Sequence, residues 1–209
     1  AKALKQLLAP VRSCYNPGAG RLDAMPIYTK AGDQGETGLL FGGRVSKADP
    51  RCEAYGATDL AVSAMGLARA LSGEQRVKEM LLQVQREMFT VGAELATAPD
   101  NYQLLLDNFS AITPDMAPRL EAYIDELEAE IDLPNAFIIP GASAASGALD
   151  LARSLLRTGE RRVVELREQG LLTNPEVLRY LNRLSDLLFM LARYEDRELP
   201  YEVVTGGRA

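Results

Sequence analysis

Apolar residues recur at three- and four-residue intervals through most of this chain, and this period limits the fold more than any other feature. Pro99 and Pro134 end the second and third periodic stretches, Thr113-Pro114 opens the third, and Asn174-Pro175 caps the fifth. No convincing pair of strands accompanies them. We therefore expect one all-α domain, a five-helix up-and-down bundle, with helices over about 52–71, 75–97, 113–131, 143–168 and 175–196.

A glycine-rich stretch, residues 26–51, precedes the periodic region. It contains neither the GxxxxGK[ST] nor the GxGxxG phosphate-binding pattern. Its glycines free backbone amides, and with Lys30 and Lys47 nearby these amides can form an anion-binding nest. A surface loop explains the same composition equally well, so both interpretations stay open.

Two terminal segments flank the domain that we expect over 26–196. Residues 1–25 are basic and are interpreted as a flexible extension, or as a segment upstream of a natural start at Met25. A targeting peptide is the functional alternative. Residues 197–209 have no periodicity and are expected to form a C-terminal tail.

The composition excludes several functions. Histidine is absent, which excludes His-dependent triads, His-liganded zinc and imidazole acid–base steps. An aromatic content of 6% and a net charge of −6 argue against nucleic-acid binding. The two cysteines fit neither a disulfide framework nor a CxxC site, and no apolar run approaches the roughly 20 residues of a membrane span. We expect a soluble cytoplasmic protein.

One polar stripe stands out on the expected helix 143–168. Asp150, Arg153, Arg157 and Glu160 follow the i, i+3, i+7, i+10 spacing, which places them on one narrow face. This face is either a solvated surface with salt bridges along the helix or an anion-binding stripe whose guanidinium groups hold phosphates. Spacing alone does not decide between the two.

Two further polar features have the same ambiguity. Helix 175–196 carries a second stripe, formed by Arg179, Asn182, Arg183 and Asp186. Asp59 lies among Ala, Gly and Leu residues in the first helix, and a carboxylate in such a segment requires a cationic partner. Arg153 is a candidate for that partner.

Several separate motifs, in the right order over about 26–196, resemble the propanediol-utilisation (PduO) type of ATP:cob(I)alamin adenosyltransferase. The motifs are Ile27-Tyr-Thr-Lys-Ala-Gly-Asp-Gln-Gly-Glu-Thr37, Arg44-Val-Ser-Lys47, Arg51-Cys-Glu-Ala-Tyr-Gly56, Gly92-Ala-Glu-Leu-Ala96, Phe137-Ile-Ile-Pro-Gly141 and Tyr180-Leu-Asn-Arg-Leu-Ser-Asp-Leu-Leu-Phe189. The resemblance implies a ferritin-like five-helix bundle that assembles as a homotrimer with active sites between subunits. It also implies transfer of the 5′-deoxyadenosyl group of ATP to cob(I)alamin, giving adenosylcobalamin and triphosphate, with a reductase and an adenosylcobalamin-dependent enzyme as possible partners.

The resemblance further implies roles for individual residues. Arg153 would pair with Asp59 across the subunit interface to seat the corrin ring, and Phe137 would close the lower face of the ring. Arg157, Glu160 and Asn182 would hold the nucleotide. The ATP phosphates, with Mg²⁺, would be wrapped by loop residues Thr29, Lys30, Gly32, Asp33, Gly35, Thr37 and Lys47, and no side chain is assigned as a resident metal ligand.

The chain departs from the family pattern at a few positions. The usual Asp-Glu-Leu-Asn of the first helix reads Asp59-Leu60-Ala61-Val62 here, and Asp150 replaces a common histidine. Thr158 stands where a second arginine is frequent, and Ala31 where the loop usually has threonine. These departures motivate the alternative of a non-catalytic paralogue that binds and delivers adenosylcobalamin; a helical bundle with no ligand is the third possibility.

Overall fold

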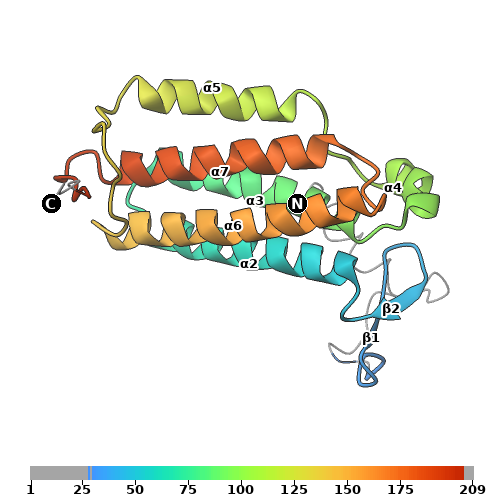
Figure 1. Cartoon of the computed structure of the whole chain (residues 1–209). Helices are drawn as coiled ribbons and strands as arrows, with labels where there is room; N and C mark the ends of the chain where they lie inside the picture. Colours follow the sequence, from blue (N-terminus) through green and yellow to red (C-terminus); the bar gives the residue numbers. More distant parts are fainter. Residues whose placement is uncertain (1–27, 29, 205–209) are drawn as a thin grey trace, which may run out of the picture.

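The computed structural model describes residue 28 and residues 30–204, and five long helices dominate it (Figure 1). Successive long helices run in opposite directions; the first packs against the second and the fourth, and the fifth packs against the third and the fourth, which confirms the all-α five-helix bundle. None of the described helices is long and apolar enough to cross a membrane. The long helices are α2 (Pro50–Leu71), α3 (Gln75–Leu95), α5 (Met116–Glu128), α6 (Ala144–Glu168) and α7 (Glu176–Glu195).

Side-chain caps fix where three of these helices begin. Asp49 accepts a hydrogen bond from the backbone N–H of Arg51, 2.8 Å away, at the start of α2. Ser143 and Ser146 exchange side-chain and backbone hydrogen bonds at the start of α6, which forms a capping box. Asn174 accepts from the Glu176 N–H at 3.1 Å before α7, as the Asn-Pro pair predicted.

The third helix begins later than its sequence predicted, at Met116, because Thr113 and Pro114 form a turn in which the Met116 N–H bonds to the Thr113 carbonyl. A 3₁₀ turn, η1 (Pro99–Asn101), and a short helix, α4 (Tyr102–Asn108), were not predicted. Tertiary contacts stabilise this short segment. The buried Glu94 carboxylate accepts from the Tyr102 hydroxyl at 2.7 Å and from the Ile112 N–H at 2.7 Å.

The expectation of no strand pair was wrong, because the glycine-rich stretch contains an antiparallel hairpin of β1 (Glu36–Gly38) and β2 (Arg44–Ser46). Its turn places Phe41 at φ 65° and the next two residues, both Gly, at φ 105° and 84°. The buried Leu39 and Leu40 attach the hairpin to the bundle, where the Leu40 N–H donates to the Ala96 carbonyl at 3.0 Å. Strands of three residues are too short to produce a clear alternation in sequence.

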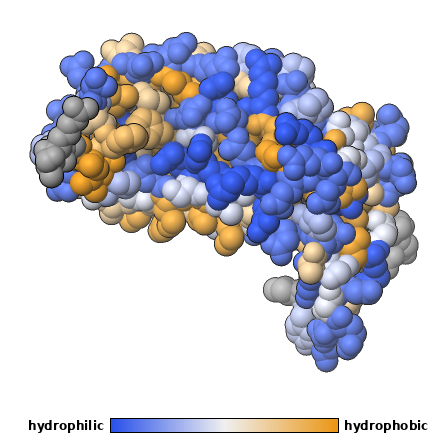
Figure 2. Space-filling model, viewed as in Figure 1, coloured by the Kyte–Doolittle hydropathy of each residue, from blue (hydrophilic) through white to orange (hydrophobic). Residues whose placement is uncertain are grey.

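Small residues allow α2 and α6 to pack closely. A Cβ atom added at Gly159 would lie 3.2 Å from the Cγ2 atom of Thr58, so the two backbones approach each other at this level. The opposite side of α2 is not covered within one chain. Leu60, Leu67 and Leu71 are 59%, 51% and 47% exposed, and Figure 2 shows hydrophobic residues along the edge of the molecule where α2 runs in Figure 1. Exposed apolar side chains grouped in this way are typical of interaction surfaces.

Candidate functional site

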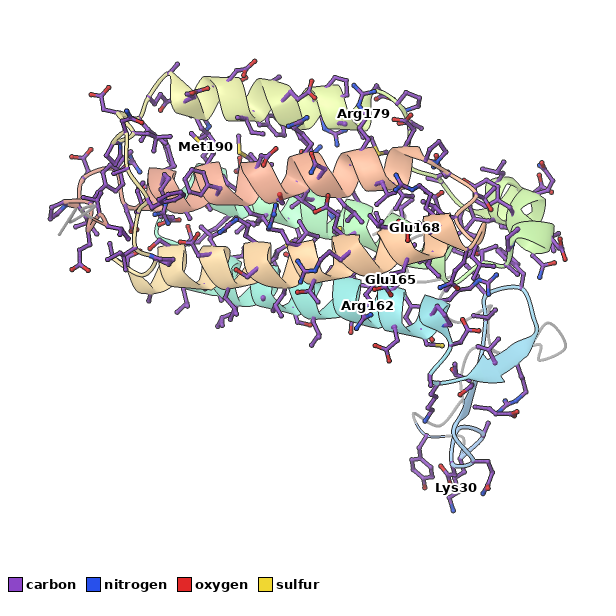
Figure 3. The ribbon with its side chains drawn as sticks, in the orientation of Figure 1. Lys30, Arg162, Glu165, Glu168, Arg179 and Met190 are labelled. Carbon is purple, nitrogen blue, oxygen red and sulfur yellow. The ribbon has the colours of Figure 1, made fainter. Side chains whose placement is uncertain are left out.

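The loop before β1 folds back on itself through main-chain hydrogen bonds. The Asp33 N–H donates to the Lys30 carbonyl at 3.3 Å, and the Gly35 N–H donates to the Gly32 carbonyl at 3.2 Å. Gly35 has φ 80° and Lys30 has φ 59°, conformations that turn the chain sharply. Figure 3 shows Lys30 at the tip of this loop, projecting from the bundle. Thr29, predicted to act with it, lies outside the described residues.

Lys47 and Gly32 meet across the base of the loop. A Cβ atom at Gly32 would lie 3.1 Å from Lys47 Nζ, so any other residue here would displace the ammonium group slightly. The Lys47 N–H also donates to the Gly35 carbonyl at 2.8 Å. The structure therefore brings together three of the residues predicted to wrap phosphates and presents an exposed cation there.

Thr37 lies at the junction of the hairpin and α2. The neighbouring Tyr55 on α2 donates a hydrogen bond from its hydroxyl to Cys52 Sγ at 3.1 Å. Burial and this bond raise the pKa of Tyr55 to about 12, and a hydrogen bond with Thr37 opposes that rise. Thr37 is partly buried, whereas Asp33 is exposed. The two predicted phosphate-loop residues thus face different surroundings.

Three predicted nucleotide residues share one face of α6 and α7. The Asn182 amide donates to Glu160 Oε1 at 3.0 Å and so links the two helices. Arg157 lies one turn away on α6, is exposed, and makes no ion pair within the described part of the chain. An exposed guanidinium beside an amide–carboxylate pair can hold an anionic, hydrogen-bonding ligand.

The predicted stripe on α6 divides at Asp150, which points inward. Asp150 is 6% exposed and accepts a hydrogen bond from the guanidinium of Arg193, which is 1% exposed. Burial raises the pKa of the Asp150 carboxyl, and Arg193 and Arg153 oppose the rise. The interpretation of the whole stripe as one solvent-facing surface was therefore wrong at this position.

Arg153 lies between Asp150 and the α7 aromatic residue Phe189. Its Nε atom is 3.7 Å from Asp150 Oδ1, and its guanidinium carbon is 5.9 Å from the centre of the Phe189 ring. Asp59 is exposed on α2 and has no ion-pair partner among residues 28 and 30–204. Within one chain, then, Arg153 is near Asp150 and not paired with Asp59, and the pairing between subunits stays a prediction.

The segment between α5 and α6, which contains Phe137, lies at the other end of the bundle from the hairpin (Figure 1). The Phe137 side chain is 85% exposed. Main-chain hydrogen bonds hold the segment to the C-terminal tail, since the Val204 N–H donates to the Phe137 carbonyl at 2.8 Å and the Ile139 N–H to the Glu202 carbonyl at 2.7 Å. A fixed, exposed phenylalanine can supply an apolar wall to a large ligand.

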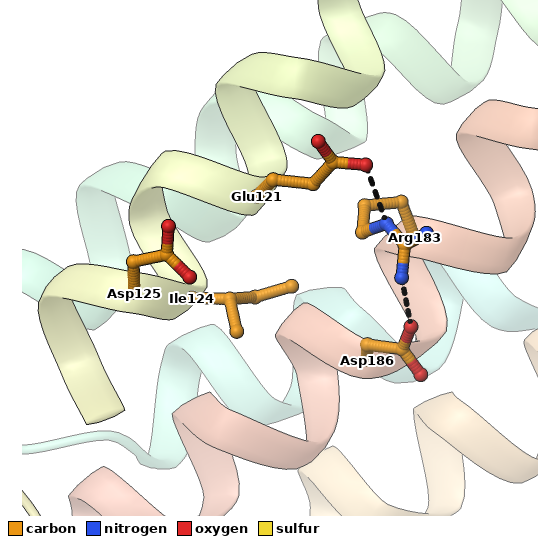
Figure 4. A pocket seen from close by; sticks show the side chains of 5 residues that line it. All are labelled: Glu121, Ile124, Asp125, Arg183 and Asp186. Atoms are coloured by element: carbon orange, nitrogen blue, oxygen red, sulfur yellow. Dashed lines mark hydrogen bonds and ion pairs between the residues drawn. The ribbon is translucent and has the colours of Figure 1, made fainter.

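The second predicted stripe, on α7, also divides. Arg183 faces α5, where it bonds Glu121 at 3.0 Å, and it also bonds Asp186 of its own helix at 2.7 Å, beside a shallow hollow (Figure 4). Arg179 is 3.8 Å from Glu176 on the same helix. These side chains form solvated ion pairs, as does Arg162 with Glu165 at 3.0 Å (Figure 3). Only Asn182 of this stripe faces α6.

The sequence interpretation missed Arg193 and Phe189 as part of this site. The available signal was an arginine within an apolar run, because Met190, Leu191 and Ala192 immediately precede Arg193. Such a cation requires a buried carboxylate partner. Nothing in the spacing along α7 identifies that partner as Asp150.

Comparison with known proteins defines the class to which this bundle belongs. Residues 27–195 match the family model described as Cobalamin adenosyltransferase. The corrinoid adenosyltransferase of Bacillus subtilis is 41% identical over 173 residues, covering 81% of this chain and 86% of that protein. The corrinoid adenosyltransferase PduO of Salmonella typhimurium is 38% identical over 179 residues, covering 83% of this chain. The match spans about half of that relative, 51% of its length.

Solved structures agree with this assignment. A variant of the PduO-type ATP:corrinoid adenosyltransferase from Lactobacillus reuteri, complexed with cobalamin and ATP, has a TM-score of 0.79 at 32% identity and covers 87% of this chain and 97% of that one. A second variant of the same protein, complexed with ATP, has a TM-score of 0.77. The chain belongs to the cobalamin adenosyltransferase family, which confirms the resemblance seen in its sequence motifs.

Proposed function

We propose that this protein transfers the 5′-deoxyadenosyl group of ATP to cob(I)alamin. The electron pair of cobalt(I) forms the cobalt–carbon bond at C5′, the C5′–O bond breaks, and triphosphate leaves with that bond's electrons. No general base is required, so the absence of histidine from the chain is compatible with the reaction. Binding of cobalamin and ATP by the related L. reuteri protein supports this choice of substrates.

The observation that carries the proposal is the cationic, hydrogen-bonding surface formed by Arg157, Glu160 and Asn182 in a chain of this family. Arg157 neutralises the charge that develops on the leaving triphosphate, and the Glu160–Asn182 pair orients the nucleoside. ATP enters as its Mg²⁺ complex. Its phosphates are wrapped by the loop residues Thr29, Lys30, Gly32, Asp33, Gly35, Thr37 and Lys47.

The corrin ring is seated by Arg153 and Asp59 from two subunits of a homotrimer. Two features support this arrangement: Asp59 is exposed without an ion pair in the described chain, and the leucines beside it on α2 are exposed. Phe137 closes the lower face of the ring and excludes an axial ligand. Sedimentation analysis should give three times the 22.8 kDa chain mass.

A turnover assay tests the proposal. Protein, Mg²⁺-ATP and chemically reduced cobalamin are mixed without oxygen, and the loss of the cob(I)alamin spectrum with formation of light-sensitive adenosylcobalamin is expected. The Arg157→Ala variant is the matched control and should react slowly. An unchanged spectrum under strong reductant contradicts the proposal, and tight adenosylcobalamin binding without ATP turnover would identify the delivery paralogue instead.

A further inference from the structure

We infer that Asp150 is a positioning residue for Arg153, and that Phe189 assists it, so that the guanidinium of Arg153 is held ready for the corrin substrate. The inference rests on the proposed function, because it deepens the role of Arg153 there. The four residues involved are Asp150, Arg153, Phe189 and Arg193.

The geometry shows one carboxylate shared unequally by two guanidinium groups. Arg193 bonds Asp150 Oδ2, while Arg153 Nε lies 3.7 Å from Oδ1. The second distance is too long for a hydrogen bond, and Arg153 Nε has no hydrogen-bond partner within the described residues. Asp150 therefore attracts Arg153 without a hydrogen bond. Nε is buried, but the terminal guanidinium nitrogens make no hydrogen bond to a described residue and can donate to a ligand or a partner subunit.

Phe189 restricts the same side chain from another direction. The guanidinium carbons of Arg153 and Arg193 lie 5.9 and 5.3 Å from the centre of its ring. A cation at this distance from an aromatic ring is attracted to it. An arginine side chain loses rotamer freedom when it binds a ligand, so one that is already held loses less and binds more tightly.

Arg193 sets how far Arg153 can approach. Its guanidinium is buried beside Asp150 and repels a second guanidinium, and this keeps Arg153 from closing fully onto the carboxylate. The side chain of Arg153 is consequently 31% exposed at the surface of α6, whereas that of Arg193 is 2% exposed. One arginine neutralises the buried carboxylate, and the other is presented to the substrate.

If Asp150 served only as the counter-charge of Arg193, removing both charges together would leave the cobalamin KM unchanged. Asp150→Leu by itself leaves Arg193 unpaired and can fail to fold. The double variant Asp150→Leu/Arg193→Met removes both charges of the Asp150–Arg193 pair and replaces them with side chains of similar volume. It retains Arg153 but removes the carboxylate that holds it.

The test is a kinetic cycle with the full-length protein. We expect Asp150→Leu/Arg193→Met to raise the KM for cob(I)alamin about tenfold while the KM for ATP changes less than twofold. Combined with Arg153→Ala, the double variant should add nothing further to the cobalamin KM. Phe189→Leu should raise the cobalamin KM by a smaller factor, and Asp186→Asn, which removes an exposed ion pair on α7, should leave both KM values unchanged.

Each result has a defined meaning. An unchanged cobalamin KM in the double variant, or an effect fully additive with that of Arg153→Ala, overturns the positioning role while parental turnover preserves the proposed function. Equal rises in both KM values also overturn it, because they indicate a general structural effect. Absence of turnover in the parent overturns the proposed function and this inference together.

Discussion

The two ends of the polar stripe on α6 differ in burial more than their spacing suggests. Asp150 and Arg157 lie seven residues apart on α6, so their azimuths around the helix differ by only about 20°. Asp150 is 6% exposed and paired with a buried arginine, whereas Arg157 is exposed and unpaired within the described residues. A helical period thus predicts which residues share a face, and the neighbouring helix decides how deeply each is buried.

The difference in burial follows from the side chains that α7 places beside each end of the stripe. Beside Asp150 it presents Arg193, which bonds the carboxylate and lies over the Phe189 ring. Beside Glu160 it presents Asn182, a short polar side chain that bonds the carboxylate and leaves the adjoining surface open. The buried end therefore contributes to stability, and we propose that the open end binds substrate.

The largest effect is expected from Asp150→Leu, the variant that leaves the buried Arg193 without a counter-charge. Removing one partner of a buried ion pair costs about 3–5 kcal/mol, so the free energy of unfolding should fall by that amount. Urea denaturation measures it. Arg157→Leu, at nearly the same azimuth, is the matched control and should change stability by less than about 0.5 kcal/mol. Similar losses in both variants would show that the two ends do not differ.

Arg157→Ala should weaken ATP binding and leave the stability unchanged. Loss of a charge-assisted hydrogen bond costs about 1.5–3 kcal/mol, which predicts a rise of roughly tenfold or more in the KM for ATP. Urea denaturation should show unchanged stability. Arg161→Ala removes another exposed arginine of α6, one that bonds Thr158, and serves as the control. An unaltered ATP KM in Arg157→Ala would remove this residue from the proposed site.

A smaller effect is expected in the glycine-rich loop, the second part of the exposed site. Gly32→Ala places a methyl group against the end of Lys47, a flexible side chain that can move aside. We expect the ATP KM to rise about threefold with little loss of stability, since displacement of one exposed ammonium costs under about 1 kcal/mol. Gly73→Ala, where a Cβ meets nothing within 4 Å, is the control. Equal kinetics for both variants would contradict a phosphate-binding role for Lys47 at this position.

The sequence was sufficient for features set by local chemistry. The period of apolar residues, together with Pro99, Pro134 and the Asn174-Pro175 pair, located the helices to within a few residues, because these signals act within one or two turns. The α4 segment was missed because it depends on Glu94, a buried carboxylate that joins distant parts of the chain. The hairpin was missed because its strands are too short for a pattern.

The candidate site shows the same division. Asn182 and Glu160, which bond each other, each belonged to a polar stripe that the helical spacing had identified. Asp150 and Arg193 are 43 positions apart, and no spacing identifies them as partners. Asp59 illustrates a different reason. Its predicted partner, Arg153, is expected to come from another subunit, so the fold of one chain does not test the pairing.

The smallest effects are expected from ionic strength, which should act differently on the buried Asp150 end and the exposed Arg157 end. Raising the salt concentration from about 0.1 to 1 M shortens the Debye length from about 10 to 3 Å, which screens exposed charges far more than buried ones. The difference in unfolding free energy between the parent and Asp150→Leu should then change by less than about 0.5 kcal/mol. Over the same range, the ATP affinity should fall about two- to threefold in the parent and by a smaller factor in Arg157→Ala. The same salt dependence in both proteins would mean that Arg157 is not the exposed charge that attracts the nucleotide, and a salt-sensitive contribution from Asp150 would mean that water reaches the pair with Arg193.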